Sequence, residues 1–235
     1  DPWVIGVCLG LRTQHTGRCE KAVAMKRWDV INRFVHTHGY TSYLEIGLST
    51  GKNFRRITFA DKTSVDPAQE QYAHADPTYK MTSDVFFETI ARTERRAYDL
   101  VFIDGLHEST QVDKDIAGAL ACLNPGGTVM LHDCNPTDEA RQRVPRTQRA
   151  WNGDVWKSVV RFRATNTRYG CLVVDADEGL GIIREDIDSN FELALPDSLT
   201  WPWLDANRTK ALGLISKKKF LGRFFPDALA PAKSI

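Results

Sequence analysis

The sequence has almost no net charge, because 31 Lys and Arg residues are balanced by 30 Asp and Glu residues in a chain of 235 residues. A balanced chain has no overall field that would draw it to nucleic acid or to a membrane surface. A nucleic-acid partner would therefore require a local basic patch. The clearest basic cluster, residues 217–219 with Arg223, is more typical of a solvated helix end. We expect no nucleic-acid partner.

The chain also lacks the cysteine patterns of disulfide-rich and zinc proteins. Its five cysteines are odd in number, widely spaced and without a CxxC pair. This usage indicates a reducing, cytoplasmic setting. The apolar run at residues 3–11 is too short to span a bilayer, and no basic region of a signal peptide precedes it. We expect no membrane span.

The order of the remaining patterns predicts an α/β fold. Apolar strands are expected at residues 43–46, 63–65, 100–103 and 128–131, and helices between them at 52–59, 85–92 and 110–123. Such alternation predicts a mostly parallel sheet with helices on both faces. RYGCLVV and GLGIIR, separated by the acidic turn DADE, predict an antiparallel hairpin. We expect a helical lead-in over residues 1–40, a core over 41–185, and an extension over 186–235 with a helix at 203–215.

The first strand ends in EIGLSTG, residues 45–51, where an acidic residue is followed by glycines. Gly47 and Gly51 permit a tight turn with positive φ. The segment lacks the GxGxxG fingerprint of dinucleotide-binding proteins, which counts against NAD and favours another adenosyl ligand. Asp66 closes the next strand 19 residues after Gly47, close to the offset at which an acidic side chain reaches ribose hydroxyls.

Two further polar segments, MTSD and FIDGLHE, follow at predicted strand ends. The carboxyl ends of parallel strands line one crevice, so these segments can share a ligand with the first two. Six segments in this order resemble the class I S-adenosylmethionine-dependent methyltransferases: EIGLSTG, SVDP, MTSDVFF, YDLVFIDGLHE, LNPGGTVMLHDCNP and WNGDVWK. Within that class the chain most resembles a bacterial group with IDGLH and LHD signatures, related to small-molecule and sugar O-methyltransferases.

The resemblance covers residues 28–184. It implies a Rossmann-like class I methyltransferase fold, with a seven-stranded, mostly parallel sheet whose last two strands form an antiparallel hairpin. It also implies S-adenosylmethionine as the cofactor. The implied cofactor residues are Glu45, Gly47, Ser49 and Gly51 around the methionine, Asp66 at the ribose, Ser83 and Asp84 at the adenine, and Asp104 in the same pocket. Ser49 stands where the family's first motif has a further glycine.

The resemblance places Asp104, His107, His132 and Asp133 at the site of methyl transfer. Transfer to a hydroxyl needs an aligned acceptor and a base, and a histidine near neutral pH can take the proton. Asp104 and Asp133 match two carboxylates of a magnesium site in related sugar methyltransferases. His132 stands where a second Asp is usual, and magnesium prefers oxygen ligands. Both a Mg²⁺ site and a metal-free site therefore remain open.

The acceptor is expected near WNGDVWK, at Trp151, Asp154, Trp156 and Lys157. Two tryptophans and mixed charges suit a polar ring such as a sugar, and they suit simple helix packing equally well. The preceding polar loop, residues 135–149, contains four arginines and is a candidate lid over an anionic or sugar acceptor.

The leading hypothesis is O-methylation of a small-molecule or saccharide acceptor. A homo-oligomer is a candidate assembly of this enzyme. An N-methyltransferase of nucleic acid is disfavoured, because such enzymes commonly carry an NPPY-like motif where this chain has IDGLH. A non-catalytic nucleotide-binding scaffold on the same fold is an alternative from another class. A hydroxylase-like relative is a third, since a fold does not fix a function.

Overall fold

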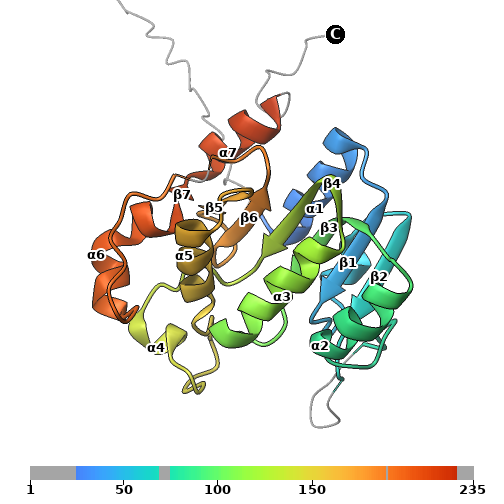
Figure 1. Ribbon diagram of the computed structural model, residues 1–235, viewed down its shortest axis with the longest axis horizontal. Coiled ribbons are helices and arrows are strands. Elements are labelled where there is room, and N and C mark those ends of the chain that lie inside the picture. Colours follow the sequence, from blue (N-terminus) through green and yellow to red (C-terminus); the bar gives the residue numbers. More distant parts are fainter. Residues whose placement is uncertain (1–24, 69–74, 189, 227–235) are drawn as a thin grey trace, which may run out of the picture.

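The protein, described by a computed structural model for residues 25–68, 75–188 and 190–226, contains one seven-stranded sheet (Figure 1). The strands are β1 (Ser42–Ile46), β2 (Asp61–Val65), β3 (Tyr98–Ile103), β4 (Leu123–Leu131), β5 (Gly170–Val174), β6 (Leu180–Arg184) and β7 (Leu214–Ile215). Their order in the sheet is β2-β1-β3-β4-β6-β5-β7. Only β6 pairs antiparallel with its neighbours, β4 and β5; the other pairs are parallel. The predicted mostly parallel sheet is confirmed.

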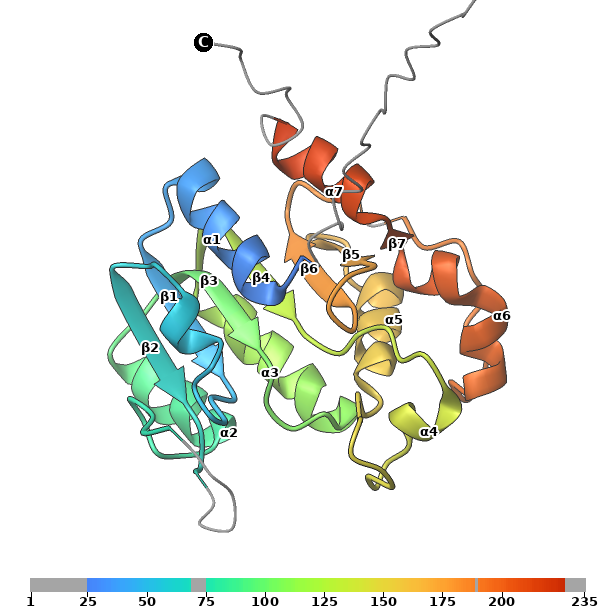
Figure 2. The same ribbon diagram turned by 180° about the vertical axis from the view of Figure 1, so that it is seen from behind.

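Helices cover both faces of this sheet. They are α1 (Arg27–His38), α2 (Ser83–Val85), α3 (Ser109–Ala121), α4 (Glu139–Gln142), α5 (Val155–Thr165), α6 (Trp201–Leu212) and α7 (Lys217–Phe224), with a π-helical turn at Phe86–Ala91 after α2. Figure 1 shows α3 and α5 in front of the sheet, and Figure 2 shows α1 on the opposite face. None of these helices is long and apolar enough to cross a bilayer.

The two-sided cover follows from the sequence of the central strands. Along β3, Val101 and Ile103 pack into the core beneath α3 and α5, whereas Leu100 and Phe102 pack into a second core beneath α1 and α7. Successive side chains of a strand point to opposite faces, so a continuous apolar strand requires cover on both sides. Packing on both faces of β3 therefore fixes the position of its carboxyl end, which Asp104 follows.

The hairpin and the strand positions agree with the predictions, and two helices do not. β5 and β6 pair from Gly170 with Arg184 to Val174 with Leu180. The helix predicted at 203–215 ends at Leu212, because Gly213 adopts a left-handed conformation and the next two residues join the sheet as β7. This edge strand follows the hairpin, so β5 and β6 are not the last two strands of the sheet.

The helix predicted at 52–59 is wrong. Only Phe54–Arg56 form a 3₁₀ turn, and Ile57 is already extended, with φ −84° and ψ 132°. The backbone N–H of Thr58 donates to Asn32 Oδ1 of α1 at 2.9 Å instead of continuing a helix. Burial of Ile57 and Phe59 against the second core therefore outweighs the local helical pattern. The apolar run at residues 3–11 and most of the helical lead-in lie outside the described residues.

Gly47 shows why the turn after β1 needs glycine. Its φ is +89°, and a Cβ at this position would lie 2.2 Å from the carbonyl oxygen of Asp104. Only glycine, which has no Cβ, allows the turn after β1 and the end of β3 to approach so closely. The turn thus brings the end of β1 against the end of β3, where the candidate site lies.

Candidate active site

A cavity of about 420 Å³ opens at the carboxyl ends of β1, β2 and β3. It is lined by Ile46, Gly47, Ser49, Val65, Asp66, Pro67, Thr82, Ser83, Asp84, Asp104, Gly105, Leu106, Gln111 and Asp115. Its size is that of a typical small-molecule site. The predicted crevice is present, but only three of the four segments predicted at strand ends follow strands, because MTSD follows no strand and its last two residues begin α2. Six of the eight residues predicted to bind the cofactor line the cavity.

Asp66 fixes the glycine turn and faces the cavity at the same time. Its Oδ2 accepts hydrogen bonds from the backbone N–H groups of Leu48 at 2.8 Å and Ser49 at 2.9 Å. Ser49 has a φ of +47°, which is uncommon for a residue other than glycine. The carboxylate therefore stabilises the turn in the conformation that lines the cavity.

Glu45 and Gly51 do not line the cavity. The Glu45 carboxylate accepts hydrogen bonds from Tyr43 Oη at 2.6 Å and Asn53 Nδ2 at 3.0 Å, and Glu45 is 1% exposed. Burial raises the pKa of Glu45 to about 7, against the opposing effect of these hydrogen bonds. Strand alternation turns Glu45 with Tyr43 toward the α1 side of the sheet. The structure thus places neither predicted residue against the cofactor cavity.

Sequence reasoning missed two residues of the cavity wall, Gln111 and Asp115 on α3. Gln111 Nε2 donates to Asp84 Oδ1 at 2.8 Å and to Asp115 Oδ1 at 3.1 Å, and Ser83 Oγ donates to Asp115 Oδ1 at 2.6 Å. The two residues lie one turn apart on α3, where Asp115 is buried and Gln111 is half-buried. A polar i, i+4 pair on the buried face of an amphipathic helix was the available signal.

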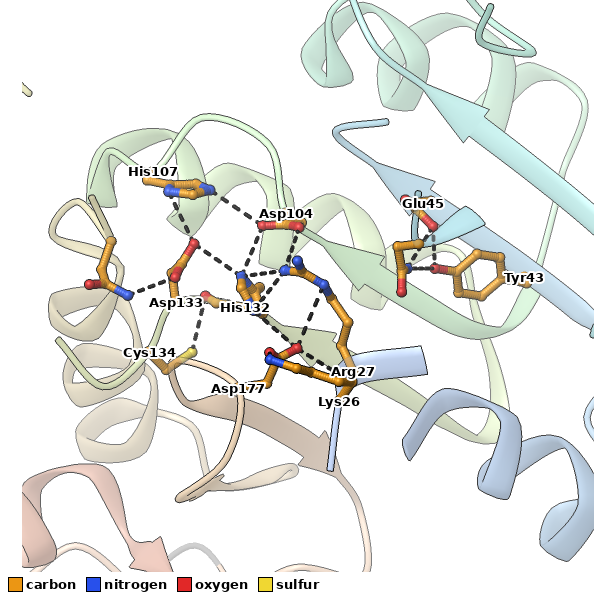
Figure 3. A network of polar contacts seen from close by, with 12 residues as sticks. Lys26, Arg27, Tyr43, Glu45, Asp104, His107, His132, Asp133, Cys134 and Asp177 are labelled. Atoms are coloured by element: carbon orange, nitrogen blue, oxygen red, sulfur yellow. Dashed lines mark hydrogen bonds and ion pairs between the residues drawn. The ribbon is translucent and has the colours of Figure 1, made fainter. Parts of the chain in front are cut away.

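Four predicted residues form a compact group next to the cavity, which we call the Asp–His cluster: Asp104, His107, His132 and Asp133 (Figure 3). Asp104 Oδ1 lies 3.2 Å from His132 Nδ1 and 3.4 Å from His107 Nε2. Asp133 Oδ2 lies 3.0 Å from His132 Nδ1 and 3.3 Å from His107 Nδ1. Neighbouring parallel strands β3 and β4 end together, which brings the four residues into contact as predicted.

Residues distant in sequence support the cluster from outside. Arg27 Nη1, at the start of α1, donates to Asp104 Oδ2 at 3.1 Å. Asn152 Nδ2, just before α5, donates to Asp133 Oδ1 at 2.6 Å. Asp177, in the hairpin turn, accepts from Lys26 Nζ at 2.8 Å and lies 3.7 Å from His132 Nε2 (Figure 3). Asn152 lies within the WNGDVWK segment, whereas no local motif marks Arg27 or Asp177, because tertiary folding alone brings them to the cluster.

Comparison with known proteins places the chain in a family. Residues 5–134, more than half of the chain, match the family described as methyltransferase domain. The chain belongs to this methyltransferase family. No curated protein matches the chain.

The methyltransferase is also similar to solved structures. One is the O-methyltransferase from Bacillus cereus in complex with SAH, at 13% identity over 68% of this chain and 80% of that chain, with a TM-score of 0.50. A second is the O-methyltransferase TomG from Streptomyces achromogenes, involved in tomaymycin synthesis and in complex with SAM, at 14% identity over 67% of this chain and 78% of that chain, with a TM-score of 0.49. A third is a putative caffeoyl-CoA O-methyltransferase from Staphylococcus aureus, at 16% identity over 67% of this chain and 82% of that chain, with a TM-score of 0.48. The Rossmann-like fold agrees with the prediction.

The two histidines of the methyltransferase cluster differ in how strongly neighbouring carboxylates raise their pKa values. Burial alone would lower the pKa of His132, but Asp104, Asp133 and Asp177 outweigh it and raise the pKa well above its usual value. Burial also opposes the charged form of His107, and its contacts with Asp104 and Asp133 raise its pKa more modestly. The His132 imidazole also holds the pKa of Asp104 well below its usual range against the effect of burial.

Accessibility separates the histidines in the same way. The His132 side chain is 6% exposed, whereas that of His107 is 18% exposed. The ring of Trp151 stacks on His107, with centroids 5.3 Å apart and an interplanar angle of 21°. His107 Nδ1 makes no hydrogen bond within the described part of the chain. His107 is thus the more exposed of the two histidines, and each of its ring nitrogens faces a carboxylate of the cluster, Nδ1 that of Asp133 and Nε2 that of Asp104.

The four residues predicted at the acceptor pocket have different roles. Trp151 lies at the cluster, as expected for a residue that borders an acceptor. Trp156 is 0% exposed and belongs to the core, so it does not border a pocket. Asp154 accepts hydrogen bonds from the backbone N–H and the hydroxyl of Ser109 at the start of α3, and it pairs with Lys157 at 3.1 Å. Helix packing therefore explains Trp156, Asp154 and Lys157.

The Asp–His cluster also fits a divalent cation. Asp104, His107 and Asp133 each offer one ligand atom, and these atoms lie within 4.8 Å of one another. The second oxygen of each carboxylate accepts a supporting hydrogen bond, from Arg27 and from Asn152. Such support is typical of metal ligands. A donor set with an imidazole suits Mn²⁺ or Zn²⁺ better than Mg²⁺.

Proposed function

We propose that this methyltransferase moves the methyl group of S-adenosylmethionine onto a hydroxyl oxygen of a small-molecule or saccharide acceptor. One observation carries the proposal. Among the described residues, Asp104 alone both lines the cofactor cavity and belongs to the Asp–His cluster. A cofactor in the cavity therefore lies next to groups that can deprotonate and orient a hydroxyl.

The reaction needs a base because a hydroxyl is a weak nucleophile. A lone pair of the acceptor oxygen forms the new C–O bond while the bond from the methyl carbon to sulfur breaks, and S-adenosylhomocysteine leaves. The hydroxyl proton passes to a base during this displacement. An amine acceptor that is already neutral has less need of such a base, so the cluster favours oxygen as the acceptor atom.

His107 is the proposed base, and His132 is a positioning residue. A base must reach the acceptor and must accept a proton. The His107 side chain is 18% exposed and contacts two carboxylates, whereas His132 is 6% exposed and is enclosed by three carboxylates and Arg27. Asp104 and Asp133 then stabilise the His107 imidazolium that forms. Of the two candidates that the sequence left open, His107 is the one that we propose as the base.

Trp151 and the loop before it form the proposed acceptor side. Trp151 Nε1 donates to the carbonyl oxygen of Arg143 at 2.6 Å, and the guanidinium carbon of Arg146 lies 5.7 Å from the centroid of its ring. An aromatic face with polar groups around it suits a hydroxylated ring. The loop thereby supports a sugar or another polar ring as the acceptor.

A bound divalent cation is a second way to activate the same hydroxyl. Asp104 and Asp133, with His107 as a third ligand, are the residues that would hold it. Such an ion would lower the pKa of the acceptor hydroxyl. His107 would then be a ligand rather than a base, and metal binding by the purified protein distinguishes the two arrangements.

A nucleic-acid acceptor has little support in the fold. The basic residues 217–219 lie on α7, and α7 is at the opposite end of the molecule from α2, whose Ser83 lines the cavity (Figures 1 and 2). Phe220 and Phe224 of the same helix are buried in the second core, which accounts for the position of α7.

The test is methyl transfer from isotopically labelled S-adenosylmethionine to three matched sets of acceptors: hydroxylated rings and sugars, their amino analogues, and RNA and DNA oligonucleotides. We expect label in the hydroxylated set, with the product mass raised by one methylene and loss of the label on treatments that cleave ethers. Transfer confined to amines or to oligonucleotides contradicts O-methylation. Failure to bind S-adenosylhomocysteine in calorimetry contradicts the cofactor site.

A further inference from the structure

A second cavity, of about 410 Å³, lies at the other end of α3 from the cofactor cavity. Gln111 and Asp115 of α3 line the cofactor cavity, whereas Gly118 and Ala121 line the second one, and the two cavities share no lining residue. The second cavity combines cations with apolar side chains, and we call it the arginine pocket: Arg92, Arg95 and Arg96 with Phe87, Ala121 and Leu123. Its size is that of a small-molecule site.

The three arginines lie on one side of the last helical turn before β3, because they are spaced by three and four residues. Like charges at this spacing repel one another. Glu94 Oε2 accepts a hydrogen bond from Arg96 Nε at 2.6 Å, which offsets one of the charges. The side chains of Arg92 and Arg95 make no hydrogen bond or ion pair within the described part of the chain. Two cations therefore remain to be neutralised at the wall of the pocket.

The helix end nearby does not account for these two cations. Cationic side chains are favoured near helix C-termini, where they can donate to the last carbonyl groups. Here backbone N–H groups already fill that role: the N–H of Glu94 donates to the carbonyl oxygen of Ile90 at 3.0 Å, and that of Arg96 donates to the carbonyl oxygen of Ala91 at 3.0 Å. The guanidinium groups of Arg92 and Arg95 are thus available to a ligand.

The rest of the pocket is apolar. A Cβ at Gly118 would lie 2.4 Å from Cδ2 of Phe87, so the phenyl ring lies directly on the backbone of α3. Burial raises the pKa of Cys122 to about 12, and its protonated thiol adds neutral surface beside Ala121. No acidic side chain is among the described residues that line the pocket. The pocket therefore joins two guanidinium groups to an apolar floor.

We propose that the arginine pocket binds a small organic anion, with a carboxylate or phosphate head at Arg92 and Arg95 and an apolar body against Phe87 and Ala121. The planar guanidinium group matches the oxygen atoms of both head groups. Ion pairs this exposed contribute little by themselves, and an apolar body gains from leaving water, so the ligand needs both parts. The site lies outside the cofactor cavity and the Asp–His cluster, and it serves a ligand other than the cofactor and the acceptor.

The test is calorimetry of the full chain with four probes below their micelle-forming concentrations: octanoate, octyl phosphate, octanol and inorganic phosphate. We expect octanoate or octyl phosphate to bind at least about tenfold more tightly than octanol and phosphate, and the tighter of the two identifies the head group. Arg92→Gln and Arg95→Gln are each expected to weaken that binding by about tenfold, and Ala121→Phe by at least as much, because the added ring fills the apolar floor. All three positions are exposed, so the variants retain the fold.

Two variants are matched controls. Arg33→Gln removes an exposed arginine from α1 on the other face of the sheet, and Ala117→Phe adds a ring to α3 at an exposed position outside the pocket. Both keep the wild-type affinity. Equal affinities of the wild type for the four probes, or no binding of any, overturn the proposal. Binding that survives both Ala121→Phe and the double substitution of Arg92 and Arg95 by Gln places the anion elsewhere and also overturns it.

Discussion

Trp151 lies flat against His107, with ring centroids 5.3 Å apart and 21° between the ring planes. This contact connects the loop before α5 to the base proposed for methyl transfer, since Trp151 Nε1 is itself fixed by the carbonyl oxygen of Arg143. The orientation of the imidazole thus depends on a residue that need not take part in the chemistry.

Trp151→Ala removes the stacked ring, and we expect kcat to fall by roughly tenfold or more because His107 loses its orientation. Trp151→Phe keeps an aromatic face and retains most of the activity. Cofactor affinity, measured by calorimetry, stays at the wild-type value in both variants, because Trp151 does not line the cavity. An alanine variant with unchanged kcat contradicts a positioning role for Trp151.

Removal of the Asp66 carboxylate weakens the glycine turn. Asp66→Ala leaves the N–H groups of Leu48 and Ser49 without their acceptor, and each such loss costs about 1 kcal/mol or more. We expect S-adenosylhomocysteine to bind about tenfold to a hundredfold more weakly, as measured by calorimetry. Asp61→Ala, at the exposed start of the same strand, is the control and keeps the wild-type affinity. Equal affinities of the two variants are incompatible with this role for Asp66.

Burial of Glu45 makes the stability of the fold depend on pH. Its pKa is raised from 4.5 to about 7 in the folded protein, so between these values the folded state keeps a proton that the unfolded chain has released. The free energy of unfolding therefore falls as pH rises from 4.5 to about 7, by up to about 3 kcal/mol, and this effect levels off above pH 7.

Glu45→Gln keeps an oxygen to accept from Tyr43 and Asn53 but cannot ionise. Urea unfolding of this variant across the same pH range is expected to lack that slope, and near pH 8 the variant is at least as stable as the wild type. Identical slopes in the two proteins would show that Glu45 is not the group responsible.

The Asp–His cluster is predicted to bind Mn²⁺ in preference to Mg²⁺ if it holds a cation. Titration followed by electron paramagnetic resonance of free Mn²⁺ measures this directly. Asn152→Ala removes the hydrogen bond to Asp133 Oδ1, and we expect it to weaken Mn²⁺ binding by about tenfold to a hundredfold. Unchanged Mn²⁺ affinity in Asp133→Asn would place any bound ion outside the Asp–His cluster. Absence of Mn²⁺ binding by the wild type favours His107 as the base.

Gly47→Ala is expected to prevent the close approach of β1 and β3. The added Cβ would lie 2.2 Å from the Asp104 carbonyl oxygen, and the backbone has a φ of +89°. We expect a loss of several kcal/mol in stability together with loss of cofactor binding. Gly39→Ala serves as the control, since that glycine also has positive φ but no atom lies within 4 Å of its Cβ position. A smaller loss of stability in Gly47→Ala than in this control contradicts the steric argument.

The sequence predicted the strands and the strand-end residues because periodicity and position along the chain determine both. Asp104, His107, His132 and Asp133 meet because β3 and β4 are neighbours in a parallel sheet. The helix predicted after Gly51 fails because Ile57 and Phe59 gain more from burial in the second core than from a helical turn. Trp156 shows the limit for side chains, since a buried tryptophan and one facing a ligand have the same sequence pattern.

Arg27, Asn152 and Asp177 lay beyond sequence reasoning for a different reason. Arg27 lies 18 residues before EIGLSTG, and Asn152 lies inside WNGDVWK but had no predicted role. Asp177 lies in a turn that reads as solvated. Gln111 and Asp115, in contrast, carried a readable signal as a polar pair on a buried helix face.

The central claim is that His107, joined to the cofactor cavity through Asp104, takes the proton of an acceptor hydroxyl. Single-turnover methyl transfer by His107→Gln, with His36→Gln on the exposed surface of α1 as the control, tests it most directly. We expect His107→Gln to bind S-adenosylhomocysteine as the wild type does and to transfer methyl at least about a hundredfold more slowly, while the control transfers at the wild-type rate. Transfer by His107→Gln at the wild-type rate would contradict it.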